Sequence, residues 1–138
     1  MANKDTRYPI VKVPCLIFAF LLCVSGCSFP IGRSYPIRVA SDVIQLEWDP
    51  PGAQPFPPGV SITGYNVYVR AHPAGEWTLI GKVPATARPQ ILLERSKTGN
   101  GAFDFGVSST TSRGGESTLH TSFDIDADPA GGWYLIWN

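Results

Sequence analysis

Apolar and polar residues alternate along most of this chain, and this alternation is the feature that most limits its possible folds. In residues 43–49, Val-Ile-Gln-Leu-Glu-Trp-Asp, the apolar Ile44, Leu46 and Trp48 are separated by polar residues. A period of two places one face in a core and is typical of a half-buried strand. No segment keeps an apolar period of 3.6, and thirteen prolines interrupt the chain. The sequence therefore predicts an all-β protein.

Turn residues separate the segments that carry this alternation. A first strand begins near Ile37, and Pro50-Pro51-Gly52, residues 72–75 and residues 112–115 are expected turns, with a loop at residues 97–101. The further expected strands span residues 43–49, 63–70, 76–83, 90–94, 103–108 and 117–123. Short strands at such even spacing predict a β-sandwich.

One face of these strands supplies the expected core, with Trp48 at its centre. A buried tryptophan contributes about 3–5 kcal/mol, judged by truncation to alanine. The other expected core residues are Ile44, Leu46, Tyr65, Val67, Val69, Leu79, Phe103, Phe105 and Val107.

Several motifs resemble the fibronectin type III family. Residues 44–51 match its apolar-x-Leu-x-Trp-x-Pro-Pro strand, and residues 62–70 match Ile-x-Gly-Tyr-x-Val-Tyr-x-Arg. Residues 77–81 and Gly115-Glu116-Ser117 resemble later parts of the pattern. The resemblance implies an immunoglobulin-like β-sandwich of about seven strands. Phe103 stands nearest to a position where the family usually has tyrosine.

The N-terminus resembles a bacterial lipoprotein signal. A basic region with Lys4, Arg7 and Lys12 precedes ten apolar residues at 15–24, and Ser25-Gly26-Cys27 follows. The resemblance implies cleavage after Gly26, a diacylglyceryl group on the Cys27 sulfur and an acylated amino terminus, for example with palmitate. An ordinary secretion signal or an uncleaved anchor are the alternatives, although a spanning helix needs about 20 apolar residues.

These features predict a layout of four segments. Residues 1–26 are the signal, 27–36 a lipidated tether, 37–124 the fibronectin type III-like domain and 125–138 an aromatic extension. Cys15 and Cys23 lie in the signal, so the processed chain holds no internal disulfide. Ser28 is not the aspartate that commonly retains such proteins in the inner membrane. By resemblance, the outer membrane or cell surface is the expected location.

Charge excludes one class of partner. The whole chain has 11 basic and 11 acidic residues, and the signal removes Lys4, Arg7 and Lys12 but only Asp5. The processed chain is therefore slightly acidic and has no basic stripe, so we do not expect it to bind nucleic acid.

Asp124, Asp126 and Asp128 are the strongest candidate metal ligands, because alternate carboxylates can converge on Ca²⁺. However, Pro129 stands where a calcium loop needs glycine, and Leu135 where it needs an acid. A solvated strand end is the better interpretation.

The remaining candidates are weaker. His72 and His120 are too far apart in sequence for a metal pair, and the hydroxyls at 108–112 lack a nucleophile elbow. Residues 55–58 match a polyproline recognition pattern, which a stiff loop explains better. The sequence therefore predicts no catalytic, cofactor or metal site.

The extension ends in Trp133-Tyr134-Leu135-Ile136-Trp137-Asn138, which mirrors the pattern of residues 44–49. Three interpretations stay open: an added strand of this domain, the remnant of a second repeat, or an edge that binds a partner.

The functional expectation is a lipid-anchored binding or spacer module of the cell envelope, not an enzyme, with a protein or surface glycan as partner. The alternatives are a structural subunit of an envelope complex, or a calcium-dependent binder or small enzyme using Asp124, Asp126 and Asp128.

Overall fold

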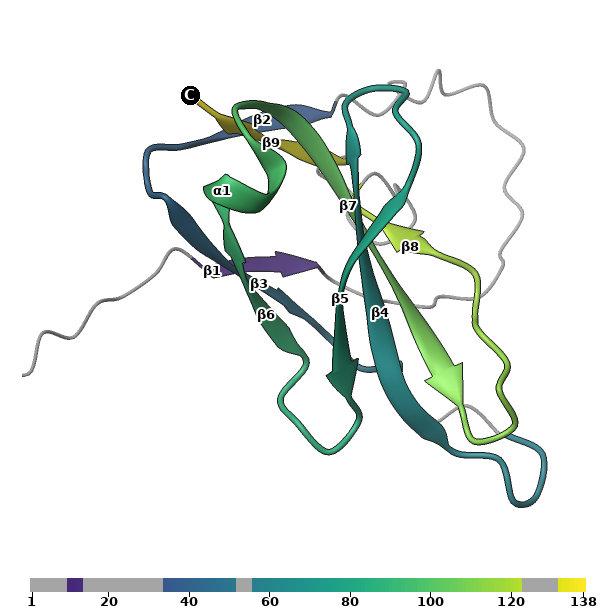
Figure 1. The fold of residues 1–138 in the computed structure, drawn as a ribbon. Helices are drawn as coiled ribbons and strands as arrows, with labels where there is room; N and C mark the ends of the chain where they lie inside the picture. The colour runs from purple at the N-terminus through teal and green to yellow at the C-terminus, as the bar shows by residue number, and fades with distance from the viewer. Residues whose placement is uncertain (1–9, 14–33, 52–55, 123–131) are drawn as a thin grey trace, which may run out of the picture.

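The computed structural model of the 138-residue chain describes residues 10–13, 34–51, 56–122 and 132–138. Within these ranges the chain is mainly β, as the alternation predicts (Figure 1). The strands are β1 (Ile10–Val13), β2 (Tyr35–Val39), β3 (Val43–Trp48), β4 (Ile62–Ala71), β5 (Thr78–Pro84), β6 (Gln90–Glu94), β7 (Gly101–Thr111), β8 (His120–Thr121) and β9 (Trp133–Trp137). One short helix, α1 (Arg95–Thr98), joins β6 to β7 in this described part.

The strands form two sheets. The smaller sheet has the order β1-β3-β6, and the larger has β2-β9-β7-β4-β5, with β8 also paired to β7. Most neighbours are antiparallel, but β1 runs parallel to β3 and β2 runs parallel to β9. The two sheets bury one shared hydrophobic cluster, to which β3 and β6 contribute from one side and β4, β7 and β9 from the other.

Trp48 lies in this cluster as expected, with 4% of its surface exposed. Its ring meets Tyr65 edge to face, with 5.5 Å between the ring centroids. Most other expected core residues are also buried, and Phe103 is partly buried against them.

Leu79 is the exception, and its assignment to the core is wrong. Its side chain is 42% exposed. The register between β4 and β5 shifts after Val67, so that Val67 pairs with Gly81 while Tyr68 pairs with Leu79. This bulge places Leu79 on the outer face, beside Tyr68. The residue that β5 contributes to the buried core is Val83.

The C-terminal aromatic segment belongs to the domain. β9 lies between β2 and β7, and Trp133, Leu135 and Trp137 are all buried. The indole nitrogen of Trp137 donates to the carbonyl of Ser41 over 2.8 Å. This confirms the interpretation as a strand docked on its parent domain and excludes an exposed edge.

The expected strand at residues 117–123 is wrong in extent, because within the described residues 117–122 only His120–Thr121 forms a strand, β8. The edge of β7 is shared: β8 pairs with Gly106 and Val107, and β9 pairs with residues 101–103. The amide of Trp133 donates to the carbonyl of Ser122, which joins the two along this edge. β8 and β9 therefore occupy the place of one strand.

Two further differences lie near the ends of elements. α1 occupies part of the expected loop at 97–101, and β2 begins at Tyr35, two residues before the expected domain start. β1 lies inside the segment assigned to the signal. In the described ranges no helix has the length and apolar character needed to cross a membrane.

Candidate functional site

The outer face of the larger sheet carries an ordered polar network. In the pairing of β4 with β7, Asn66 lies opposite Ser108 and Arg70 opposite Asp104. Residues at these positions point away from the core, so exposure to water is expected. Instead, Asp104, Ser108 and Asn66 are all buried. Leu119 packs above Gly106, the residue between the two polar positions of β7, and helps to cover this face.

Asp104 is the centre of the first half of this network, which we call the Asp104 cluster. Its carboxylate is fully buried and accepts a hydrogen bond from Arg70 Nε over 3.0 Å. Its second oxygen lies 2.9 Å from His72 Nδ1, and because a carboxylate only accepts, that nitrogen carries the hydrogen. A buried carboxylate needs such partners, since an isolated charge in the interior is very costly.

Aromatic rings hold both partners of Asp104 in place. The Arg70 guanidinium lies 4.6 Å from the centroid of the Trp77 ring. The His72 imidazole stacks on Tyr134 of β9, with 3.9 Å between centroids and 2° between the ring planes. The Asp104 cluster therefore joins β4, β7, β9 and the loop before β5 into one rigid unit.

Glu116 is the centre of the second half, the Glu116 cluster. Tyr68 donates its hydroxyl to Glu116 Oε1 over 2.7 Å, and Ser108 donates to the same oxygen. Hydrogen bonds from Ser108, Asn66 and Tyr68 lower the pKa of Glu116 to about 2. The same bond to Glu116 raises the pKa of Tyr68. Glu116 is therefore an anion at neutral pH.

The chemistry of this face suits recognition better than catalysis. A carboxylate–imidazole pair also occurs in hydrolases, where the imidazole activates a nucleophile. Here Arg70 shares the carboxylate with His72, and the imidazole is stacked flat on a phenol ring. Fixed arginine, tyrosine and tryptophan side chains are instead the residue types enriched where proteins bind partners.

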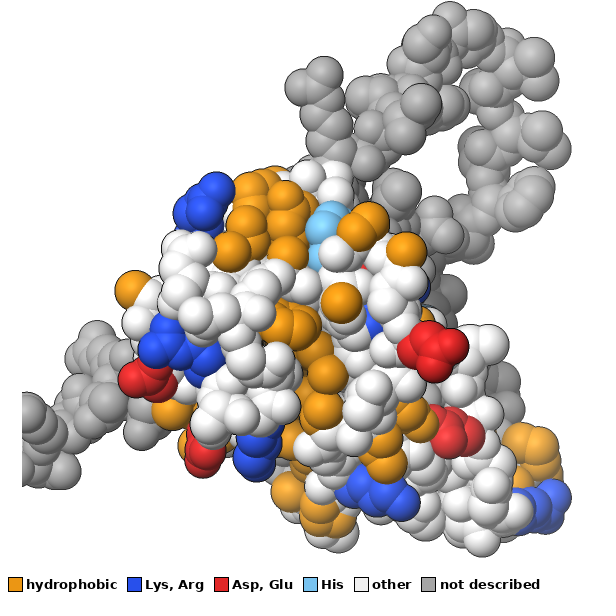
Figure 2. Space-filling model, turned by 45° about the horizontal axis from the view of Figure 1, so that its top comes forward, with side chains coloured by type: hydrophobic (Ala, Val, Ile, Leu, Met, Phe, Trp, Pro, Cys, Tyr) orange, Lys and Arg blue, Asp and Glu red, His pale blue; other side chains and the backbone are white. Residues whose placement is uncertain are grey.

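The surface also presents apolar groups. Leu79 of β5, beside Tyr68, is 42% exposed, and Leu92 of β6 is 48% exposed on the smaller sheet. Figure 2 shows hydrophobic side chains gathered along the middle of one face, with Lys, Arg, Asp and Glu side chains mainly around them. An apolar centre with a charged surround is typical of a binding surface.

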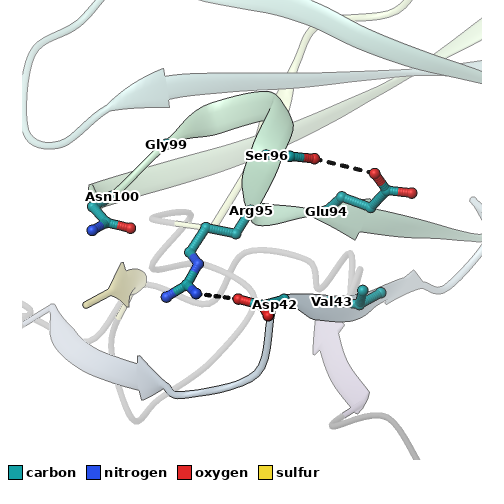
Figure 3. A pocket seen from close by; sticks show the side chains of 7 residues that line it. All are labelled: Asp42, Val43, Glu94, Arg95, Ser96, Gly99 and Asn100. Atoms are coloured by element: carbon teal, nitrogen blue, oxygen red, sulfur yellow. Dashed lines mark hydrogen bonds and ion pairs between the residues drawn. The ribbon is translucent and has the colours of Figure 1, made fainter.

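A hollow lies beside α1 (Figure 3). Its volume is about 520 Å³, and it is lined by Asp42, Val43, Glu94, Arg95, Ser96, Gly99 and Asn100. The Arg95 guanidinium binds the Asp42 carboxylate and donates to the carbonyl of Asn138 over 2.5 Å. Because Asp42 already neutralises Arg95, the hollow offers no unbalanced cation to a ligand.

The residues singled out from the sequence have different outcomes. His72 belongs to the Asp104 cluster, whereas His120 is exposed on β8 opposite Val107. Ser108, one of the hydroxyls without a nucleophile elbow, is buried and donates to Glu116. Phe56, in the proline-rich loop, is 39% exposed. Cys27, Asp124, Asp126 and Asp128 lie outside the described residues.

No group of three or more His, Cys, Asp or Glu side chains is placed to hold a metal ion within the described part of the chain. Sequence reasoning missed Asp104 and Arg70. The sequence does contain a signal for Asp104, which stands between two apolar aromatic residues in Phe103-Asp104-Phe105. In a strand whose aromatic residues face the core, the acid between them lies on the opposite face.

Comparison with protein-family models, with curated proteins and with solved structures gives no match for this chain.

Proposed function

We propose that this chain is a fibronectin type III-like binding module of the cell envelope, anchored to a membrane by a lipid on Cys27. Immunoglobulin-like sandwiches place strands C, F and G in one sheet and pair B with E in the other. The proposal is supported by the neighbours β4, β7 and β9 in one sheet and the pair β3 and β6 in the other, which can be matched to these strands. The parallel pairing of β2 with β9 is a departure from a simple antiparallel sandwich.

The observation that carries the binding function is the polar network on the outer face of the larger sheet. Asp104 fixes Arg70 and His72, and these in turn contact Trp77 and Tyr134. Side chains held in this way lose little conformational entropy when a partner binds. A protein or surface glycan is therefore the proposed ligand of this face, with Leu79 at its apolar part.

A matched pair of substitutions tests this face. Leu79→Asp changes an exposed leucine on the proposed face, and Leu92→Asp changes a similarly exposed leucine on the other sheet. We expect envelope components captured by the purified chain to be lost with Leu79→Asp and retained with Leu92→Asp. Equal capture by both variants contradicts the proposed face, and capture by neither the original chain nor the variants favours a spacer.

Anchoring is tested separately through Cys27. The junction Val-Ser-Gly-Cys at residues 24–27 motivates this part of the proposal. We expect Cys27→Ser to abolish acylation and processing, measured by detergent partitioning and by the mass of the N-terminus. A Cys27→Ser protein that is still processed and acylated would refute the lipoprotein assignment.

A further inference from the structure

The outer edge of β3 is occupied by a strand that the processed protein does not retain. β1 runs parallel to β3, with Val11 beside Leu46, Lys12 beside Glu47 and Val13 beside Trp48. All of β1 lies within residues 1–26, which lipoprotein processing removes, so this inference rests on the proposed function. We propose that the β3 edge of the processed protein docks an extended segment of a partner protein, parallel to β3, with the pattern aliphatic–basic–aliphatic.

Removal of β1 leaves one side of β3 without a ladder. The other side is paired with β6 along its length, from Val43 opposite Glu94 to Glu47 opposite Gln90. The backbone groups that face β1 then have no partner within the smaller sheet. Such an edge is a template for another extended chain, and strand addition is a common mode of peptide recognition.

The required pattern occurs twice, in β1 beside β3 and in β2 beside β9, and Figure 1 shows these two pairs of strands. In the smaller sheet, Val-Lys-Val at 11–13 lies parallel to Leu-Glu-Trp at 46–48. In the larger sheet, Ile-Arg-Val at 37–39 lies parallel to Leu-Ile-Trp at 135–137. Two Leu-x-Trp strands therefore each accept an aliphatic–basic–valine strand in the same direction and register.

The aliphatic positions follow from the core. Leu46 is fully buried and Trp48 is 4% exposed, so the two neighbouring register positions lie at the rim of the hydrophobic cluster. Apolar residues there extend the core, whereas charged residues would lose hydration.

The basic position follows from Glu47. Its Oε1 accepts from Arg88 over 3.0 Å, while its Oε2 is buried and has no hydrogen-bond partner among the side chains that the structure describes. β1 brings lysine to this register position. In the larger sheet the arginine of the pattern, Arg38, lies beside Ile136, so the carboxylate that favours a basic residue is specific to the β3 edge. Because the planar guanidinium presents five donors, a partner strand with arginine beside Glu47 is the better occupant.

A second copy of the chain is a less suitable donor of this strand. Its residues 37–39 carry the pattern, but they are already paired with β9, and Val39 is buried there. If a second copy donated residues 37–39 to β3, its own β2 would leave β9. One pair of strands would then be lost for each pair that forms. A partner with an unpaired extended segment avoids this loss.

The test uses the peptide Tyr8–Pro14 with Lys12→Arg, labelled with a fluorophore and measured by anisotropy. Three proteins are compared in detergent: the processed protein from membranes, the full chain carrying Cys27→Ser, and the full chain carrying Cys27→Ser and Val11→Pro. We expect the peptide to bind the processed protein and the Val11→Pro chain. Its affinity for the chain that carries Cys27→Ser alone should be at least about tenfold lower, because β1 of that chain competes for the edge at high effective concentration. Proline at position 11 weakens β1, since it cannot donate to a ladder.

Charge reversal provides a matched control. In the processed protein, Glu47→Lys should weaken binding of the arginine peptide by about fivefold, and the same peptide with glutamate at that position should recover it. A peptide that exchanges the residues at positions 12 and 13 places the basic residue beside Trp48 and should not bind. Unchanged tryptophan fluorescence shows that each variant is folded.

Absence of peptide binding to the folded Val11→Pro chain overturns the acceptor edge, whatever the N-terminus of the native protein is. Self-association of the processed protein that the peptide disrupts overturns the proposed partner and makes a second copy the occupant. If mass analysis finds residues 1–26 intact in the native protein, the lipoprotein assignment is refuted and the β3 edge is not exposed in the cell. Peptide binding to the Val11→Pro chain tests the acceptor edge separately, because it does not depend on processing.

Discussion

Trp137 should contribute a large part of the stability of the domain, although it stands next to the last residue of the sequence. Its side chain is 1% exposed, its ring meets Phe103 at 6.4 Å between centroids, and its Nε1 donates to the Ser41 carbonyl. Truncation of a buried tryptophan costs about 3–5 kcal/mol. A loss of that size is a large fraction of a typical stability of about 5–15 kcal/mol.

Two substitutions separate packing from hydrogen bonding at this position. Trp137→Ala removes both, and we expect the free energy of unfolding to fall by about 4 kcal/mol. Trp137→Phe keeps much of the ring but loses the bond to Ser41, so we expect a smaller fall of about 1–2 kcal/mol. Leu92→Ala is the control, because it removes an exposed side chain and should change stability by less than about 0.5 kcal/mol.

The assay is urea unfolding of the full chain in detergent, followed by circular dichroism, with the slope of each transition compared. A midpoint for Trp137→Ala equal to that of Leu92→Ala would show that β9 is not part of the cooperative core. Equal losses for Trp137→Ala and Trp137→Phe would show that the bond to Ser41, and not the packing, dominates.

Two further predictions concern the outer face. Asp104→Asn removes the carboxylate that binds Arg70. We expect the free energy of unfolding, measured in urea, to fall by about 2–3 kcal/mol, less than for a fully buried pair because Arg70 is partly exposed. An Asp104→Asn protein as stable as the wild type would contradict a stabilising role of the Asp104 cluster. The folded pKa of Glu116, about 2, lies below its ordinary value of 4.5. The ionised Glu116 therefore contributes fully to the free energy of unfolding above pH 4.5, and this contribution is lost as pH falls toward 2. When stability is measured against pH, Glu116→Gln should lose this part of the pH dependence. The same pH dependence in Glu116→Gln and the wild type would contradict the role of Glu116.

Local pattern was sufficient for the class of fold and for several elements. The alternation in residues 43–49 predicts β3 and the burial of Ile44, Leu46 and Trp48, because a strand turns successive side chains to opposite faces. The short strand expected at residues 90–94, directly after Pro89, matches β6 at its observed bounds. These predictions succeed because the information lies within a few consecutive residues.

The candidate site was only partly accessible from sequence. The alternation around Phe105 places Asp104 on the outer face, but its contacts with Arg70 and His72 join residues more than thirty positions apart. The sequence offers His72 only as a weak metal-ligand candidate, because its place in the Asp104 cluster depends on the pairing of β4 with β7. A pattern identifies the face of a residue but does not identify its partner.

The sequence by itself determined that the chain is mainly β and which sides of β3, β4 and β7 are apolar, because both follow from a period of two. Only the tertiary structure decided how the strands pair. Leu79 fits the apolar pattern yet lies outside the core, because a bulge opposite Val67 and Tyr68 shifts the register by one residue. β9 fits three interpretations, and its place between β2 and β7 follows from hydrogen-bond ladders with distant segments. Those ladders bond uniform backbone groups, so the choice among possible partners depends on how all the apolar faces pack together.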